Sequence, residues 1–196
     1  MPRLFTALEI PRDSALSLSL LRGGLPGARW VDVENYHITL RFIGDVEGHV
    51  ADEIAAALDR VHRPSFTLAL SGVGAFGSRK PHSIWAGVAS SPELNALQGE
   101  IERICQRLGL PSDPRKFTPH VTLARLRNSS PIEVASYLSA RGNFSTNSFR
   151  VGRFVLMSSR DSVGGGPYVV EEAWPLDGIR PALATAGASD IQRPYR

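Results

Sequence analysis

The spacing of apolar residues along the chain predicts short strands alternating with helices. Apolar residues recur at helical spacing in four segments, three of which open with a proline. These helices are expected to begin at Pro11, Glu47, Pro92 and Pro131, and the first of them is expected to end at Gly23–Gly24. Shorter apolar runs between them predict strands at residues 3–10, 30–33, 37–43, 65–77, 82–89, 120–126, 148–160 and 166–176.

The pattern also indicates how the chain is divided. Both halves place a helix before a strand that begins with histidine, which favours a duplicated α+β lobe over a tandem array. After Leu176 no period is sustained, and the residues are rich in Ala, Gly and Pro. We therefore expect one two-lobed domain over residues 1–179, followed by a flexible tail over residues 180–196.

Composition says more about the cellular location of the protein than about its function. No apolar run approaches the roughly 18 to 20 residues that span a bilayer, and the N-terminus lacks the features of a signal peptide. A cytoplasmic monomer with no membrane partner is expected. The net charge of +3 suits an anionic ligand without indicating nucleic acid by itself. Cys105, the single cysteine, lies on an apolar helical stripe and is expected to be a buried structural thiol.

Two of the predicted strands begin with the same four residue types, His-aliphatic-Thr-Leu. The tetrad stands in "YHITLRF" at residues 37–40 and in "PHVTLAR" at residues 120–123. Alternate residues of a strand face the same way. Each histidine therefore shares a polar face with the threonine two residues later, while the two aliphatic residues face a core.

If the two halves pair about a pseudo-two-fold axis, His37, Thr39, His120 and Thr122 meet in one cleft. Displacement at phosphorus requires one proton to leave the attacking oxygen and another to reach the leaving oxygen. Histidine, with an unperturbed pKa of ~6.5, performs either task near neutral pH. The threonine hydroxyls can donate hydrogen bonds to the phosphoryl oxygens.

Other interpretations of the tetrads are weaker. A single copy is typical of a half-buried structural histidine, but both copies begin a strand and are followed by arginine within five residues. Zinc usually takes three or four protein ligands, and the tetrads supply two. The glycine-rich segments lack the strand-loop-helix setting and the lysine of a phosphate-binding loop. We therefore expect neither a metal nor another cofactor.

The chain resembles the 2H phosphoesterase superfamily, and within it the RNA 2′,3′-cyclic phosphodiesterases, also called 2′-5′ RNA ligase-like proteins. The likeness covers roughly residues 3 to 176 and runs through "RLFTALEIP", "ARWVDVENYHITLRFIGDV", "GAFGSRKPHSIWAGV", "PHVTLARL" and "GGGPYVV". The resemblance implies an α+β fold of two pseudo-symmetric lobes, with antiparallel sheets around a central cleft and helices outside. It also implies catalysis without a metal.

The resemblance further implies a reaction and roles for the four tetrad residues. A terminal 2′,3′-cyclic phosphate of RNA, or of a nucleotide, is opened to leave a 2′-phosphate. His37 would donate a proton to the leaving oxygen, and His120 would accept one from water. Thr39 and Thr122 would bind the phosphate. Without the resemblance, the residues alone do not say which histidine is the acid.

Contacts to the nucleotide are less well defined by the sequence. Phe42 and Arg125 each follow a tetrad histidine by five residues, and the resemblance implies that they contact the nucleotide. Strict alternation opposes this, because an odd offset turns them away from the imidazoles unless a bulge intervenes. Arg41 falls on the histidine face by alternation but could equally be solvated. Strand packing is the favoured role for Tyr168.

Three alternatives stay open at this point. The same chemistry could act on a small nucleotide such as an ADP-ribose cyclic phosphate. Run in reverse, it could join RNA ends through a 2′-5′ linkage. A protein of another class, a non-catalytic binder of RNA ends, could use the same cleft.

Overall fold

The structure is a computed structural model that describes residues 3–159 and 168–177. The expected turn between the last two strands and the expected tail over residues 180–196 lie outside the described residues. Within them, helices and antiparallel strands alternate along the chain as predicted, so the α+β class is confirmed.

One antiparallel sheet runs through the molecule. Its strands follow the order β10-β9-β1-β3-β7-β6-β5, with β2 paired to β7. The strand bounds are β1 Arg3–Glu9, β2 Ala28–Trp30, β3 His37–Asp45, β5 Leu70–Phe76, β6 Ser83–Val88, β7 His120–Leu126, β9 Arg153–Ser159 and β10 Tyr168–Pro175. The two strands that begin with the tetrads, β3 and β7, are therefore neighbours at the centre of the sheet.

The sheet divides into two lobes where β3 meets β7. The one residue pair in register between these strands, within the described chain, is Ile38 with Val121. Both are the second residue of a tetrad, so the pseudo-two-fold axis that relates the tetrads passes through this pair. The first lobe holds β10, β9, β1 and β3, and the second holds β7, β6, β5 and β2.

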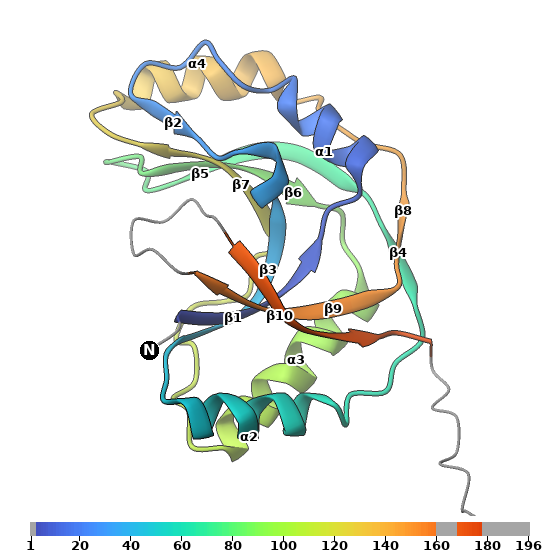
Figure 1. Cartoon of the computed structure of the whole chain (residues 1–196). Coiled ribbons are helices and arrows are strands. Elements are labelled where there is room, and N and C mark those ends of the chain that lie inside the picture. The colour runs from blue at the N-terminus through green and yellow to red at the C-terminus, as the bar shows by residue number, and fades with distance from the viewer. Residues whose placement is uncertain (1–2, 160–167, 178–196) are drawn as a thin grey trace, which may run out of the picture.

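The helices cover the outer surfaces of the lobes. Figure 1 shows α2 and α3 beside the first lobe and α1 and α4 beside the second. Their bounds are α1 Arg12–Ser19, α2 Gly48–Leu58, α3 Pro92–Arg107 and α4 Pro131–Arg141. None of these helices combines the length and apolar character that a membrane span requires in the described part of the chain. The lobes interleave along the sequence, because α1 follows β1 but packs with the other lobe.

Two predicted strands are each divided in two. The segment 65–77 forms β4 (Phe66–Leu68) and β5, and the segment 148–160 forms β8 (Phe149–Val151) and β9. β4 and β8 pair with each other in a separate two-stranded sheet. Figure 1 shows both running between the lobes. These crossing segments satisfy their backbone hydrogen bonds by pairing together, since neither remains beside the central sheet.

Two other predicted elements end early. The strand expected at residues 30–33 ends at Trp30, and a 3₁₀ turn over Val33–Asn35 follows it. The helix expected to run to Gly23–Gly24 ends at Ser19. By contrast, α3 and α4 begin at the predicted prolines, where the Ser91 and Ser130 side chains accept backbone hydrogen bonds as N-caps.

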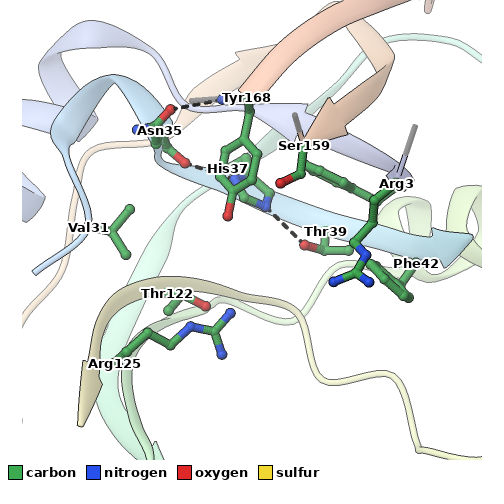
Figure 2. A pocket seen from close by; sticks show the side chains of 11 residues that line it. Arg3, Val31, Asn35, His37, Thr39, Phe42, Thr122, Arg125, Ser159 and Tyr168 are labelled. Atoms are coloured by element: carbon green, nitrogen blue, oxygen red, sulfur yellow. Dashed lines mark hydrogen bonds between the residues drawn. The ribbon is translucent and has the colours of Figure 1, made fainter. Parts of the chain in front are cut away.

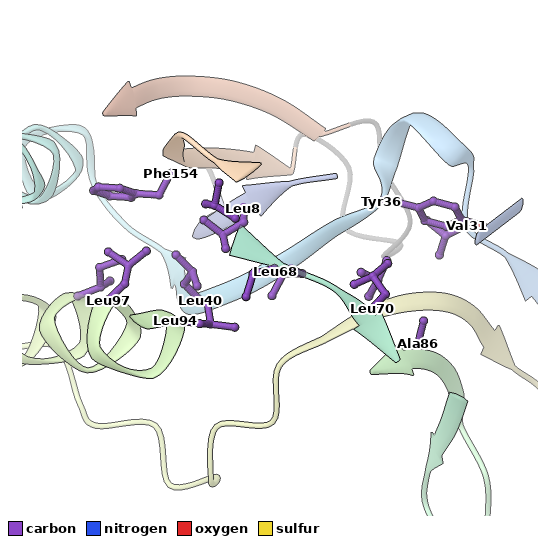
Figure 3. Close-up of a cluster of buried hydrophobic side chains, with 14 of the residues drawn as sticks. Leu8, Val31, Tyr36, Leu40, Leu68, Leu70, Ala86, Leu94, Leu97 and Phe154 are labelled. Carbon is purple, nitrogen blue, oxygen red and sulfur yellow. The ribbon is translucent and has the colours of Figure 1, made fainter. Parts of the chain in front are cut away.

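The core fixes the direction of the tetrad side chains. Ile38 and Val121 are fully buried. Figure 3 shows Leu40 of the first tetrad strand among buried leucines that include Leu94 and Leu97 of α3. Because the aliphatic members face the core, the histidine and threonine of each tetrad face away from it. Cys105 on α3 is also fully buried, and burial raises the pKa of its thiol to about 11, which confirms a structural cysteine.

Candidate active site

A pocket lies where the polar faces of β3 and β7 meet. His37, Thr39 and Phe42 line it from β3, and Thr122 and Arg125 line it from β7. Figure 2 shows these side chains on the two facing strands. The space between these side chains measures about 820 Å³, a volume that includes the part open to solvent. His120 is not among the lining residues. It stands on β7 two residues before Thr122.

Both imidazoles are held by the same backbone contact. His37 Nδ1 lies 2.8 Å from the carbonyl oxygen of Asn35, and His120 Nδ1 lies 2.6 Å from that of Thr118. A carbonyl oxygen can only accept, so each Nδ1 carries the hydrogen and donates it. Each carbonyl belongs to the residue two positions before its histidine. The neutral rings therefore present Nε2 with its lone pair as the reactive nitrogen.

The threonine of the first tetrad faces this reactive nitrogen. Thr39 Oγ1 lies 3.1 Å from His37 Nε2, a hydrogen bond that Figure 2 shows along the edge of β3. When the ring is neutral, the Thr39 hydroxyl is the donor. The hydroxyl and the imidazole nitrogen are thus close enough to contact neighbouring oxygens of one bound phosphoryl group.

Aromatic rings hold each imidazole in position. His37 contacts Phe5 and Tyr168, with ring centroids 5.0 and 4.9 Å away. His120 contacts Phe76 at 4.9 Å and, less closely, Trp85 at 6.1 Å. Sequence reasoning favoured packing for Tyr168, which these ring contacts support, but it missed the other three. Phe5 was detectable from alternation in β1, whereas Phe76 and Trp85 reach His120 only through the pairing of β5, β6 and β7.

Both histidines hold protons more weakly than an ordinary imidazole. The pKa of His37 is lowered to about 4, mainly by burial and to a smaller extent by the nearby charges of His120 and Arg125, while the Asn35 hydrogen bond acts in the opposite direction. Burial also lowers the pKa of His120, with Arg125 and Arg115 acting in the same direction and Thr118 opposing. Both rings are therefore mainly neutral at pH 7 in the free protein.

A β-bulge in each strand turns Phe42 and Arg125 into the pocket. On β3, Thr39 pairs with Ala7 while Arg41 pairs with the next residue, Thr6, so Leu40 is the extra residue. On β7, Thr122 pairs with Trp85 while Ala124 pairs with the preceding residue, Ile84, so Leu123 is the extra residue. The bulges occur at the same place in both repeats. They reverse the alternation and bring the fifth residue after each histidine onto the histidine face.

The same bulge buries Arg41, which plain alternation places on the histidine face. Arg41 is 7% exposed and forms an ion pair with Glu102 of α3. It also donates to the backbone carbonyls of Phe42 and Pro111. Arg41 thus joins β3 to α3 behind the site and does not face the pocket.

The ion pair of Arg41 should contribute strongly to stability. Glu102→Gln leaves a guanidinium buried without its counter-charge, which we expect to lower the free energy of unfolding by about 3 kcal/mol in urea denaturation at pH 7. Glu100→Gln is the matched control on the same helix, because the Glu100–Arg63 pair is more exposed, at 26% and 30%. The control should lose less than about 1 kcal/mol. Equal losses in the two variants would contradict the role of Glu102 as the counter-charge of the buried Arg41.

The described residues contain no group of three or more histidine, cysteine or carboxylate side chains that could hold a metal ion. The three histidines outside the tetrads, His49, His62 and His82, are exposed. His82 stacks on Phe76 with ring centroids 6.3 Å apart. It thus lies behind a ring that contacts His120.

Comparison with known proteins connects this geometry to a family. Residues 24–162 match the model of the 2′-5′ RNA ligase superfamily. The chain is 38% identical to an RNA 2′,3′-cyclic phosphodiesterase of Geobacillus stearothermophilus, over 62% of this chain and 41% of the relative's length. It is 35% identical to a protein of the same name from Aeropyrum pernix, over 76% of this chain and 86% of the relative.

A solved structure agrees with these relatives. The crystal structure of Escherichia coli LigT complexed with 3′-AMP superposes with a TM-score of 0.72 at 28% identity, covering 90% of this chain and 99% of that chain. The two-lobed fold and the resemblance inferred from the doubled tetrad are thereby confirmed. The chain belongs to the 2′-5′ RNA ligase superfamily.

Proposed function

We propose that the protein hydrolyses the 2′,3′-cyclic phosphate at RNA or nucleotide ends to a 2′-phosphomonoester. The observation that carries the proposal is the repeated arrangement on β3 and β7, in which a backbone carbonyl fixes Nδ1 of each histidine and makes Nε2 the nitrogen that can take up or give a proton. Relatives named RNA 2′,3′-cyclic phosphodiesterase support the choice of substrate.

The reaction needs two proton transfers on opposite sides of phosphorus. Nε2 of His120 takes a proton from water, and the water oxygen forms the new bond to phosphorus. The bond from phosphorus to the 3′ oxygen breaks, and Nε2 of His37 gives its proton to that oxygen. The product carries a 2′-phosphate and a free 3′ hydroxyl. Each ring ends in the protonation state of the other, so protons exchange with solvent before the next cycle.

The remaining tetrad residues bind the phosphoryl group. Thr39 and Thr122 donate hydrogen bonds to the two non-bridging oxygens, on which negative charge resides throughout the displacement. Phe42 and Arg125 contact the nucleotide, Phe42 by stacking on a base and Arg125 through its charge. Their presence among the pocket residues supports these roles.

The same residues can catalyse the reverse type of reaction. If a ribose hydroxyl of a second RNA end attacks phosphorus in place of water, the product is a 2′-5′ linkage. The proton transfers are the same in both cases. In water, hydrolysis is favoured because water greatly exceeds RNA ends in concentration.

The proposal is tested by incubating the protein with adenosine 2′,3′-cyclic phosphate in EDTA and identifying the product by phosphorus NMR. Adenosine 2′-phosphate as the main product is expected. Formation of the 3′-phosphate, or loss of turnover on adding EDTA, contradicts the proposed chemistry. Binding of the cyclic nucleotide without turnover identifies a non-catalytic binder instead.

A further inference from the structure

The pocket continues along β3 past the tetrad, to a cation at its far end. Figure 2 shows His37, Thr39 and Phe42 in this order along β3, with Arg3 beside Phe42. The register agrees, because Glu9 pairs with His37 while Arg3 pairs with Asp45 at the other end of the same two strands. The cleft is thus longer than the phosphoryl site between the threonines requires.

The lining of this pocket is positively charged. Arg3 and Arg125 belong to it, and no carboxylate is among the described lining residues. The two arginines come from different lobes, Arg3 from β1 and Arg125 from β7. Figure 2 shows both guanidinium groups reaching into the space between the strands. A phosphodiester chain would meet positive charge at both places.

Arg3 is held in this direction by a carboxylate outside the pocket. Its Nη2 and Nε lie 2.9 and 3.3 Å from the two oxygens of Asp45. A guanidinium carries five N–H donors, so donors remain for a substrate oxygen. The side chains of Arg3 and Asp45 are 41% and 46% exposed. The pair therefore lies at the open end of the cleft, where a longer substrate would leave it.

An exposed aromatic ring, that of Phe42, lies beside Arg3 and past the tetrad on β3 (Figure 2). Phe42 pairs with Phe5 of β1. Phe5 follows Arg3 by two residues, so the two side chains lie on the same face of β1. Phe42 is 43% exposed, so its ring is accessible to a base in the cleft. Successive bases of single-stranded RNA stack on such rings while arginine binds the backbone.

We propose that Arg3 binds the phosphodiester that joins the terminal nucleotide to the preceding one, so that the preferred substrate is an oligonucleotide ending in a 2′,3′-cyclic phosphate. This inference rests on the proposed function and specifies its substrate class. A mononucleotide cyclic phosphate lacks the second phosphate and makes no use of Arg3. Asp45 acts as a positioning residue, which directs the guanidinium and offsets part of its charge.

The test compares kcat/KM for adenosine 2′,3′-cyclic phosphate with that for a dinucleotide ending in the same group. The native protein should favour the dinucleotide by about tenfold, the value of one charge-assisted hydrogen bond. Arg3→Gln should abolish this preference, and Arg3→Lys should restore part of it. Asp45→Asn should increase the preference, because it removes the competing carboxylate.

The opposite effects of the two substitutions separate binding from structure. If the ion pair only stabilises the fold, Arg3→Gln and Asp45→Asn lower both rates alike, and the inference is overturned. Arg153→Gln is the matched control. It breaks a similar exposed pair with Glu9, 2.7 Å long, at the opposite end of β1, and should leave the preference unchanged. A native protein that hydrolyses neither substrate overturns the proposed function, and this inference with it.

Discussion

Replacing His37 or His120 by alanine should lower kcat for hydrolysis of a 2′,3′-cyclic nucleotide by about 10²–10⁴-fold. Each ring supplies one of the two proton transfers, and a positioned acid or base contributes an acceleration of this order. Because the two act in one displacement, the double variant should be little worse than either single variant. The measurement is the initial rate at saturating substrate, in EDTA.

A matched control and a second substrate sharpen this prediction. His49→Ala removes an exposed imidazole from α2 and should leave kcat unchanged. A p-nitrophenyl phosphodiester has a leaving group that needs no proton, so His37→Ala should recover most of its loss on it while His120→Ala does not. Recovery by His120→Ala instead would exchange the assigned roles. Full activity of either single variant on the cyclic nucleotide would rule out the two-histidine mechanism.

A second large effect is expected in the pH dependence. Turnover needs one histidine protonated and the other neutral, so kcat/KM should be bell-shaped. The pKa of His37 is lowered to about 4, and that of His120 is also lowered from its usual value. The maximum should therefore lie below pH 6.5. As pH rises from 6.5 to 8.5, the singly protonated form becomes scarcer by about tenfold per unit, so kcat/KM should fall about 100-fold.

Bound substrate should shift this dependence in a definite direction. The negative phosphodiester stabilises an imidazolium beside it, which raises the pKa of the proton donor in the complex. The alkaline limb of kcat should then lie at higher pH than that of kcat/KM. Both are measured between pH 4.5 and 9 at constant ionic strength. A kcat/KM that is flat or rising between pH 6.5 and 8.5 would show that no protonated histidine is needed in the free protein.

Periodicity within single segments predicted much of the molecule. The tetrads alone indicated that His37 and Thr39 share a face, and the hydrogen bond between them agrees. The apolar stripe around Cys105 predicted its burial. Pro92 and Pro131 predicted where α3 and α4 begin. Each of these features depends on residues a few positions apart, which is why local patterns were sufficient.

Features that depend on distant partners were not predicted. The bulges at Leu40 and Leu123 are places where β3 and β7 each carry one extra residue opposite the neighbouring strand. Without knowing that β1 and β6 are those neighbours, alternation placed Arg41 in the site. The division of residues 65–77 into β4 and β5 also depends on distant partners, because β4 pairs with β8 and β5 pairs with β6.

Binding of a nucleoside 2′-phosphate tests the central claim most directly. In a crystal structure of the complex, Nε2 of His37 and Nε2 of His120 should each lie about 3 Å from a different oxygen of the same phosphoryl group, on opposite sides of phosphorus. A phosphoryl group that contacts one imidazole while the other faces solvent or protein alone would contradict it.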